Sequence, residues 1–247
     1  MNKLIIKDMN FQYEDKTVFT NFNLTLKKGL TFLIGNNGSG KSTLFNILSF
    51  KLPCIKNITI DDKEFCKNNK DVIVLTLNYV KSLKGKVSEI LEVNENNNRI
   101  IKSLDLNEFL DFEYSKLPLA IKIKICIAVI LINDYSIIFI DDILCWLNKT
   151  DKNKILKKIK TISKKKIILI ATNNLEDTIF GSRILLLNNG EIVLDETIDK
   201  FYNNENIMKE NNMKLPFLVD LSVNLKLYNT VSDIYFDMEK LVDDIWK

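Results

Sequence analysis

Hydrophobic and polar residues alternate along two segments near the start of the chain, residues 4–11 and 18–26. Alternation with a period of two is typical of strands that bury one face, so both segments predict strands of a half-exposed sheet. Three shorter runs, residues 30–34, 137–140 and 167–170, are almost entirely apolar. Such runs predict central parallel strands, because both faces of these strands are covered.

The same criteria predict shorter elements in the rest of the chain. Further strands are expected at residues 58–60 and 72–77. The Asn189-Gly190 dipeptide predicts the turn of a hairpin between residues 184–187 and 192–194. Helices are expected at 44–48, at 87–110 with a loop at 94–98, at 152–162, at 216–227 and at 233–246. The polar segment 203–212 predicts a linker before the last two helices.

A glycine-rich loop joins the strand at 30–34 to the helix that follows it. Its sequence, GNNGSGKS, matches the pattern G-x-x-x-x-G-K-[ST] in full and lies between a strand and a helix, as that motif requires. Glycine lets backbone N–H groups converge on a phosphate, and the helix N-terminus adds favourable partial charge. The loop holds three of the seven glycines in the chain. The residues expected to bind a nucleotide are therefore Asn36, Asn37, Gly38, Ser39, Gly40, Lys41, Ser42 and Thr43.

Three residues are expected to bind the charged groups of the site: one at the phosphates and two at a magnesium ion. Lys41 can reach the terminal phosphates, and the Ser42 hydroxyl can bind Mg²⁺. Asp141 ends the apolar run 137–140, where a phosphate-loop protein places its second magnesium ligand. The alternative for Asp141 is an ordinary aspartate at a strand end.

Composition excludes several other classes of function. Lys and Arg number 35 against 32 Asp and Glu, a net charge of only +3, and only Arg99 and Arg183 are arginines, so no nucleic-acid partner is expected. The chain has no histidine and its four cysteines lack metal-binding spacing, which argues against zinc and favours buried, reduced thiols. The apolar run 125–132 is too short to span a bilayer, and no signal peptide is expected, so a soluble protein is predicted.

The motifs together resemble those of ABC-type ATPases along nearly the whole chain. Tyr13 resembles the aromatic residue that stacks on adenine in that family, residues 35–43 resemble its phosphate loop, and residues 137–142 resemble its second nucleotide motif. The C-terminal part is similar to the ATPase subunits of energy-coupling factor (ECF) transporters. That likeness lies in Gly190-Glu191-Ile192-Val193, Asp199-Lys200-Phe201-Tyr202, Leu215-Pro216, Leu221 and Leu225-Lys226-Leu227.

The resemblance implies an α/β fold of the P-loop NTPase class. It implies a mixed sheet core, an antiparallel β lobe, a reduced helical lobe and a small C-terminal helical extension. Residues 1–202 would form the nucleotide-binding domain and residues 203–247 the extension. ATP and Mg²⁺ are the implied cofactors. The implied partners are a second ABC ATPase subunit, a transmembrane scaffold and a substrate-binding membrane subunit, which would place the chain at the cytoplasmic face of a membrane.

Several positions depart from the family pattern. The LSGGQ signature falls on residues 117–121, which read Leu-Pro-Leu-Ala-Ile. In the family this segment opens a helix. We therefore expect residues 121–132 to be helical, although the alternation Ile-Lys-Ile-Lys-Ile at 121–125 favours a strand by period alone. The remaining departures are Asp142 for the catalytic glutamate, Asn173 for the switch histidine, Asn148 for the D-loop aspartate, and Thr76 or Asn78 for the Q-loop glutamine. The alternatives are a strand-end carboxylate for Asp142 and a turn residue for Asn173.

The departures leave two functions open. One is a transport ATPase subunit that hydrolyses ATP slowly. Losing one preorganised hydrogen-bond donor costs about 10²- to 10³-fold in rate, and several catalytic groups are changed in this chain. The other is an ATP-binding dimerisation module that supports an active partner. A soluble ABC protein acting on DNA or the ribosome is disfavoured, since the chain has neither a long coiled-coil insertion nor a second nucleotide domain.

Overall fold

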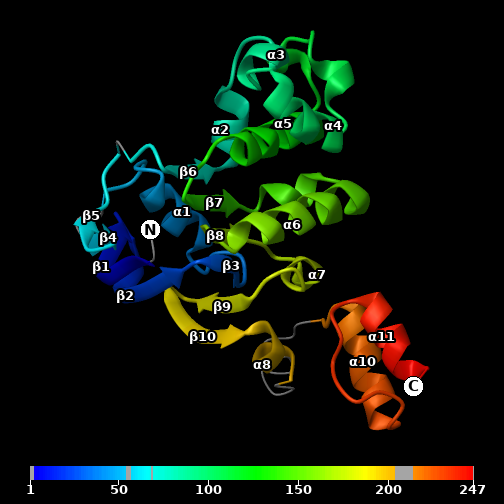
Figure 1. Ribbon diagram of the computed structural model, residues 1–247. Coiled ribbons are helices and arrows are strands. Elements are labelled where there is room, and N and C mark those ends of the chain that lie inside the picture. Colours follow the sequence, from blue (N-terminus) through cyan, green and yellow to red (C-terminus); the bar gives the residue numbers. More distant parts are fainter. Residues whose placement is uncertain (1–2, 54–56, 68, 204–213, 247) are drawn as a thin grey trace.

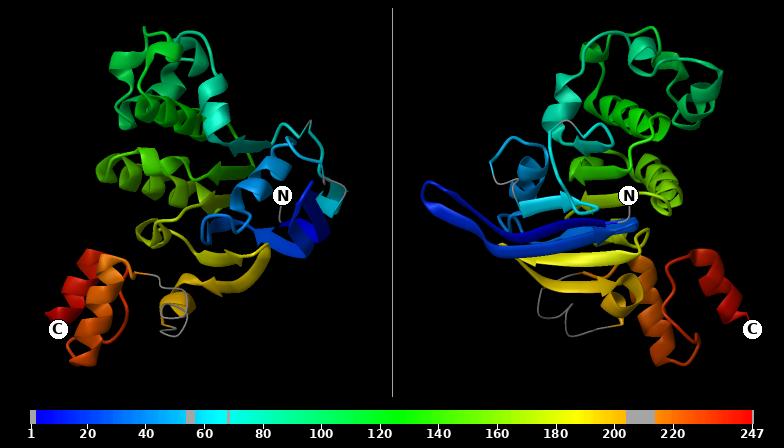
Figure 2. Two further views of the ribbon diagram at one scale, coloured as in Figure 1. Left: turned by 180° about the vertical axis from the view of Figure 1, so that it is seen from behind. Right: turned by 60° about the vertical axis from the view of Figure 1, so that its left-hand side comes forward.

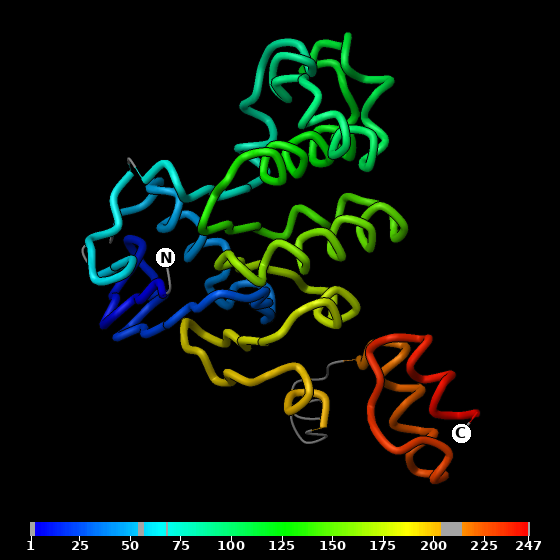
Figure 3. Tube along the Cα trace, viewed as in Figure 1, coloured from blue at the N-terminus to red at the C-terminus, as the bar shows by residue number. Residues whose placement is uncertain are grey.

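A computed structural model describes residues 3–53, 57–67, 69–203 and 214–246. The described residues form two sheets (Figure 1). The larger sheet has the strand order β10-β9-β3-β8-β7-β6, and the smaller has the order β2-β1-β4-β5. The helical lobe formed by α2–α5 and the C-terminal helices lie at opposite ends of the molecule, as the chain trace shows (Figure 3).

The larger sheet consists of the apolar runs seen in the sequence. Its strands are β3 (Gly29–Ile34), β6 (Val72–Leu75), β7 (Ile137–Asp141), β8 (Ile167–Ala171), β9 (Arg183–Asn188) and β10 (Glu191–Thr197). All neighbouring pairs are parallel except the β9–β10 hairpin, so the sheet is mixed. The central strands are buried on both faces. Along β7, Ile137 and Phe139 pack toward α1 (Lys41–Leu48), and Ile138 and Ile140 pack toward the cluster that contains α5 (Leu119–Ile132) and α6 (Lys149–Ser163). The three predicted central strands and the hairpin are confirmed.

The smaller sheet follows the alternating segments. β1 (Lys3–Tyr13) pairs antiparallel with β2 (Lys16–Lys27), and β4 (Ile58–Ile60) pairs with β1 and with β5 (Lys63–Glu64). In this register Leu4 lies opposite Leu26 and Ile6 opposite Leu24, and all four side chains are buried. β2 also contacts β10, which places the β1–β2 hairpin beside the larger sheet (Figure 2).

The helical lobe contains α2 (Leu77–Ser82), α3 (Val87–Ile90), α4 (Glu95–Ser103), the short 3-10 turns η2 (Asn107–Phe109) and η3 (Tyr114–Lys116), and α5 (Leu119–Ile132). The predicted helix at 121–132 is confirmed. Ile123 through Ile130 are buried all round it, so α5 has no polar face. The alternation of Ile and Lys was misleading for that reason: the Lys124 side chain is buried beside Asp151 of the next helix, and it does not mark an exposed strand face.

The strand predicted at 72–77 is confirmed as β6, but its C-terminal boundary was wrong, and so was the loop predicted within the helical lobe; capping explains both. The strand expected at 72–77 ends at Leu75, because the Thr76 hydroxyl accepts the N–H of Tyr79 at 3.2 Å and begins α2. The loop expected at 94–98 is the start of α4, because the Asn94 side chain accepts the N–H of Asn97 at 3.0 Å. Asparagine is common both in loops and at helix N-caps, so the asparagines at 94–98 did not distinguish a loop from the start of a helix.

After β7 the chain continues through η4 (Ile143–Trp146) and α6 (Lys149–Ser163), and α7 (Leu175–Thr178) follows β8. The C-terminal part contains α8 (Ile198–Tyr202), α10 (Phe217–Leu227) and α11 (Met238–Ile245). The helix predicted at 233–246 begins later than expected, because Asp237 is its N-cap. Of the predicted linker only Asn203 lies within the described residues, where it follows α8; residues 204–212 lie outside them.

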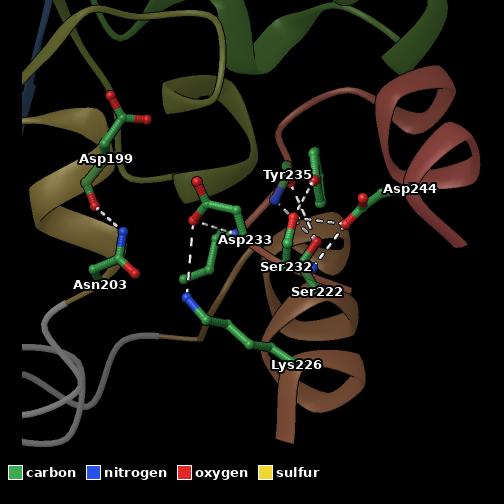
Figure 4. A network of polar contacts seen from close by, with 9 residues as sticks. Asp199, Asn203, Ser222, Lys226, Ser232, Asp233, Tyr235 and Asp244 are labelled. Carbon is green, nitrogen blue, oxygen red and sulfur yellow. Dashed lines mark hydrogen bonds and ion pairs between the residues drawn. The ribbon is translucent and has the colours of Figure 1, made fainter. Parts of the chain in front are cut away.

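Polar contacts join the last two helices (Figure 4). The Ser222 hydroxyl of α10 accepts the N–H of Tyr235 at 3.1 Å, and the Asp244 carboxylate of α11 accepts the N–H of Ser232 at 2.7 Å. Val219 and Ile234 pack in one cluster with Ile184 of β9, so the extension rests on the larger sheet. The boundary between residues 202 and 203 stays a prediction.

Two sequence expectations concern the surface. Cys126 is buried as expected, but Cys66 and Cys145 are exposed, so the prediction of buried thiols was wrong for them, and Cys54 lies outside the described residues. Within the described ranges, no helix combines the length and the apolar character needed to cross a membrane.

Candidate functional site

The glycine-rich loop lies between β3 and α1 and leaves no room for side chains at its ends. A Cβ atom at Gly35 would lie 2.2 Å from the Leu187 carbonyl oxygen, which is closer than any real contact. Gly40 is the N-cap of α1, with φ of 114°, a left-handed value that costs other residues energy. The β9–β10 turn packs against the loop and supports it, because the Gly190 N–H donates a hydrogen bond to the Ser39 carbonyl oxygen at 2.9 Å.

The Lys41 ammonium lies inside this loop. Its Nζ donates to the carbonyl oxygens of Gly35 at 2.6 Å and Asn36 at 3.1 Å. Burial lowers the pKa of Lys41, and the nearby Asp142 and Asp141 carboxylates oppose that shift. The Ser39 hydroxyl is also buried, and no described residue forms a hydrogen bond with it. A fixed cation and an unsatisfied hydroxyl in one loop fit an anion with several acceptor oxygens, such as a phosphate chain.

A cleft of about 250 Å³ opens beside the loop. It brings together ten of the residues expected at the nucleotide site: Tyr13, Asn37, Gly38, Gly40, Lys41, Ser42, Thr43, Asp141, Asp142 and Asn173. Asn36 lines a neighbouring hollow instead, and Ser39 is buried in the loop. The cleft also contains Lys16 and Val18 of the β1–β2 hairpin, which the sequence analysis missed.

Tyr13 lies at the rim of this cleft. Its side chain is 44% exposed, its ring meets that of Phe11 edge-on at 5.0 Å, and its hydroxyl lies 3.4 Å from the Thr43 hydroxyl. An exposed aromatic face at the mouth of a polar cleft suits stacking on a flat base. The adenine-binding role of Tyr13 stays a prediction.

Two adjacent carboxylates face Lys41 at the end of β7. Burial, together with the charge of Asp142, raises the pKa of Asp141 to about 6, and the Lys41 and Lys51 ammonium groups oppose the shift. Burial also raises the pKa of Asp142, which adopts a left-handed backbone conformation with φ of 47°. Asp141 and Ser42 line the same cleft and offer the hard oxygen ligands that Mg²⁺ prefers. They fit a magnesium ion whose other ligands are phosphate oxygens and water.

Asn173 follows β8 and connects the two sides of the cleft. Its side-chain amide donates to the Asp142 carboxylate at 3.3 Å and to the Asn37 side-chain oxygen at 3.4 Å. A single amide thus contacts both the phosphate loop and the candidate catalytic carboxylate. An amide can orient a carboxylate or a bound oxygen, but unlike histidine it cannot take up a proton near neutral pH.

The remaining family positions have structural roles in this chain. Neither Thr76 nor Asn78 lines the cleft: Thr76 caps α2 and accepts a hydrogen bond from Lys51 Nζ at 3.3 Å, and Asn78 is exposed. Asn148 caps α6 by accepting the N–H of Asp151 at 2.8 Å. Pro118 is the N-cap of α5, and no described side chain caps that helix. The segment at the signature position therefore presents a helix N-terminus without a hydroxyl and, at Pro118, without an N–H.

Comparison with known proteins assigns a family. The profile of the ABC transporter family matches residues 19–144, just over half of the chain. The chain is 29% identical to the energy-coupling factor transporter ATP-binding protein EcfA1 of Mesomycoplasma hyopneumoniae, with 98% of this chain and 97% of that protein covered. It is 28% identical to EcfA1 of Fusobacterium nucleatum, with 96% of each covered, and 24% identical to EcfA1 of Staphylococcus aureus, with 98% and 97% covered.

Solved structures show the same fold. The cbiO1 protein of Clostridium perfringens, described as part of the ABC transporter complex cbiONQ, matches with a TM-score of 0.67 at 19% identity, covering 86% of this chain and 95% of that one. A bacterial Atm1-family ABC exporter with ATP bound matches with a TM-score of 0.72 at 16% identity, covering 85% of this chain and 41% of that one.

Proposed function

Because this chain belongs to the ABC transporter family, we propose that it is the ATP-binding subunit of an energy-coupling-factor-type import complex. The observation that carries the proposal is the Lys41 ammonium, held inside a complete phosphate loop and facing two carboxylates across one cleft. The near-equal length of the EcfA1 relatives supports the ECF type, since the likeness includes the C-terminal extension.

Each group of the cleft has a part in holding MgATP. The loop N–H groups and Lys41 would bind the phosphates, Ser42 and Asp141 the magnesium ion, and Tyr13 the adenine. MgATP, when bound, supplies the phosphoanhydride bond whose cleavage drives transport. Asp142 is the group that can accept a proton from water or orient it, and the Asn173 amide holds that carboxylate by a 3.3 Å hydrogen bond.

Hydrolysis should nevertheless be slow. Aspartate is shorter than glutamate by one methylene, roughly 1.5 Å of covalent reach, and a displacement of about 1 Å can cost on the order of a hundredfold in rate. Pro118 replaces an N–H donor at the N-terminus of α5. These changes favour, as the second candidate, a hydrolysis-deficient ATP-binding dimerisation module that supports an active partner ATPase.

The proposal includes an assembly. A second ABC ATPase subunit would supply the γ-phosphate donors that residues 117–121 of this chain lack, so a heterodimer is favoured over a homodimer. A transmembrane scaffold and a substrate-binding membrane subunit would complete the complex and place this chain at the cytoplasmic face of a membrane. The exposed N-terminus of α5, which no side chain among the described residues caps, is the end that would face the second ATPase.

Restoring the missing groups tests whether this chain has a catalytic site. Asp142→Glu alone should change the single-turnover rate of ATP hydrolysis by less than about threefold, because the switch position still lacks a histidine. Asp142→Glu together with Asn173→His should raise the rate on the order of tenfold or more, and by more than either single change. Calorimetry on all variants should give the same ATP affinity as the parent. A large gain from Asp142→Glu alone would show that only the carboxylate limits turnover.

A further inference from the structure

A buried ion pair lies behind the loop that carries Asn173. Asp177 of α7 is 3% exposed, and its Oδ1 lies 2.6 Å from Lys152 Nζ of α6. The other oxygen, Oδ2, accepts the hydroxyl of Thr172 at 2.9 Å. Thr172 is itself buried and is the residue before Asn173. Both oxygens of this carboxylate are therefore engaged, one by a helix and the other by the loop.

The Thr172 hydroxyl extends this connection past Asn173. Its oxygen accepts the N–H of Asn174 at 3.1 Å. A hydroxyl has a single proton, and since that proton is donated to Asp177, a lone pair is left for the Asn174 N–H. The two hydrogen bonds support each other and join the residues on either side of Asn173.

Asn173 itself is exposed, so packing does not fix its side chain. Its amide contacts Asp142 and Asn37 at 3.3 and 3.4 Å, distances at which a small shift of the backbone would break the hydrogen bonds. The loop backbone around Asn173 must therefore be held by its neighbours. The hydrogen bond from the Asn174 N–H to the Thr172 hydroxyl provides that restraint. Asp177 orients the Thr172 hydroxyl by accepting its proton.

The desolvation cost of the Lys152–Asp177 ion pair also favours a role in holding the loop around Asn173. Burying two charges is expensive, and an apolar pair of similar volume often stabilises a fold equally well, so a buried ion pair is poorly explained by stability alone. Lys152 lies in the first turn of α6, and its N–H donates to the carbonyl of Asn148, the residue that caps this helix, at 3.0 Å. The pair thus links the start of α6 to the loop beside the nucleotide cleft.

We propose that Asp177, held by Lys152, is a positioning residue of the ATP site: through the Thr172 hydroxyl it fixes the loop so that the Asn173 amide reaches Asp142. The proposal rests on the function proposed above, because Asn173 matters to turnover only if Asp142 acts on ATP. Asp177 would affect the placement of Asn173, whereas nucleotide affinity would depend on the phosphate loop.

Thr172→Val removes the hydroxyl and keeps both the shape of the side chain and the Lys152–Asp177 ion pair. We expect the Asn174 amide, followed by NMR in the nucleotide-free chain, to exchange with solvent about five- to tenfold faster, since one hydrogen bond is lost. The single-turnover rate of ATP hydrolysis should fall on the order of tenfold, with ATP affinity within about twofold of the parent. Thr172→Ser, which keeps the hydroxyl, should restore both readouts, and Thr172→Ala repeats the test if the valine variant does not fold.

Thr178→Val is the matched control. Its hydroxyl is equally buried in α7 but bonds to the Leu175 carbonyl and to Tyr202, away from Asn173. We expect it to leave Asn174 exchange and turnover unchanged. The proposal is overturned if Thr172→Val leaves Asn174 exchange as in the parent, or if Thr178→Val affects exchange and turnover to the same degree. Because the exchange measurement needs no nucleotide, it tests whether Thr172 restrains the loop, separately from whether the chain binds ATP.

Discussion

Replacing Lys41 with alanine is expected to weaken binding of MgATP by about a hundredfold or more. Two charge-assisted hydrogen bonds to phosphate oxygens, each with a net worth of about 1.5–3 kcal/mol, would be lost. In the nucleotide-free protein the Lys41 ammonium is instead satisfied by the carbonyl oxygens of Gly35 and Asn36. Its loss removes a desolvated charge, so the fold should persist. Titration calorimetry measures the affinity, and circular dichroism confirms the fold.

Lys16→Ala is the control for this change. Lys16 lines the same cleft, but it is exposed on the β1–β2 hairpin and lies outside the phosphate loop. Removing its charge should alter the affinity by no more than a few fold, because an exposed charge is screened by water and salt. Equal affinities of the Lys41→Ala variant and the parent would show that the loop is not the phosphate site.

Lys152→Met is expected to lower the free energy of unfolding by about 3–5 kcal/mol, because it leaves the Asp177 carboxylate buried without its partner. Methionine is similar to lysine in length, so little packing is lost. Chemical denaturation gives the free energy. Lys154→Met, two residues further along α6, breaks an exposed ion pair with Asp105 and should lower the free energy of unfolding far less, because water and salt screen exposed charges.

A double variant separates stability from positioning. Lys152→Met combined with Asp177→Leu removes both buried charges and should regain most of the lost stability, since an apolar pair replaces the ion pair. The same variant should still show fast exchange of the Asn174 amide, because the Thr172 hydroxyl has lost its acceptor. Equal stability losses in the Lys152→Met and Lys154→Met variants would contradict the role given to the buried pair.

The order of the elements could be predicted from the sequence because it depends on local patterns. A few adjacent residues are enough to predict a buried strand at 137–140 and a phosphate-binding loop at 35–42. The resemblance to ABC ATPases named Asn173 and Asp142, and the structure brings their side chains to 3.3 Å. What failed was also local: Thr76 and Asn94 each cap a helix, and short polar residues fit a cap and a loop equally well.

The contacts that hold the site together could not be predicted, because they join ordinary residues that are distant in the sequence. Nothing in the residue types of Lys152 and Asp177 distinguishes a buried pair from two charges on exposed helix faces. The N–H of Gly190 supports the phosphate loop only because the β9–β10 turn folds beneath Ser39. Lys16 and Val18 reach the cleft because they follow the turn after Tyr13, and no motif marks them.

The central claim is that this chain binds ATP well and hydrolyses it slowly. The direct measurement is to mix the purified chain with radiolabelled MgATP, isolate the protein–nucleotide complex and follow the identity of the bound nucleotide with time. Our account predicts about one nucleotide per chain, retained mainly as ATP, with turnover well below about 1 s⁻¹, the low end of ordinary enzyme rates. No retained nucleotide, or rapid conversion of the bound ATP to ADP by this chain alone, would contradict it.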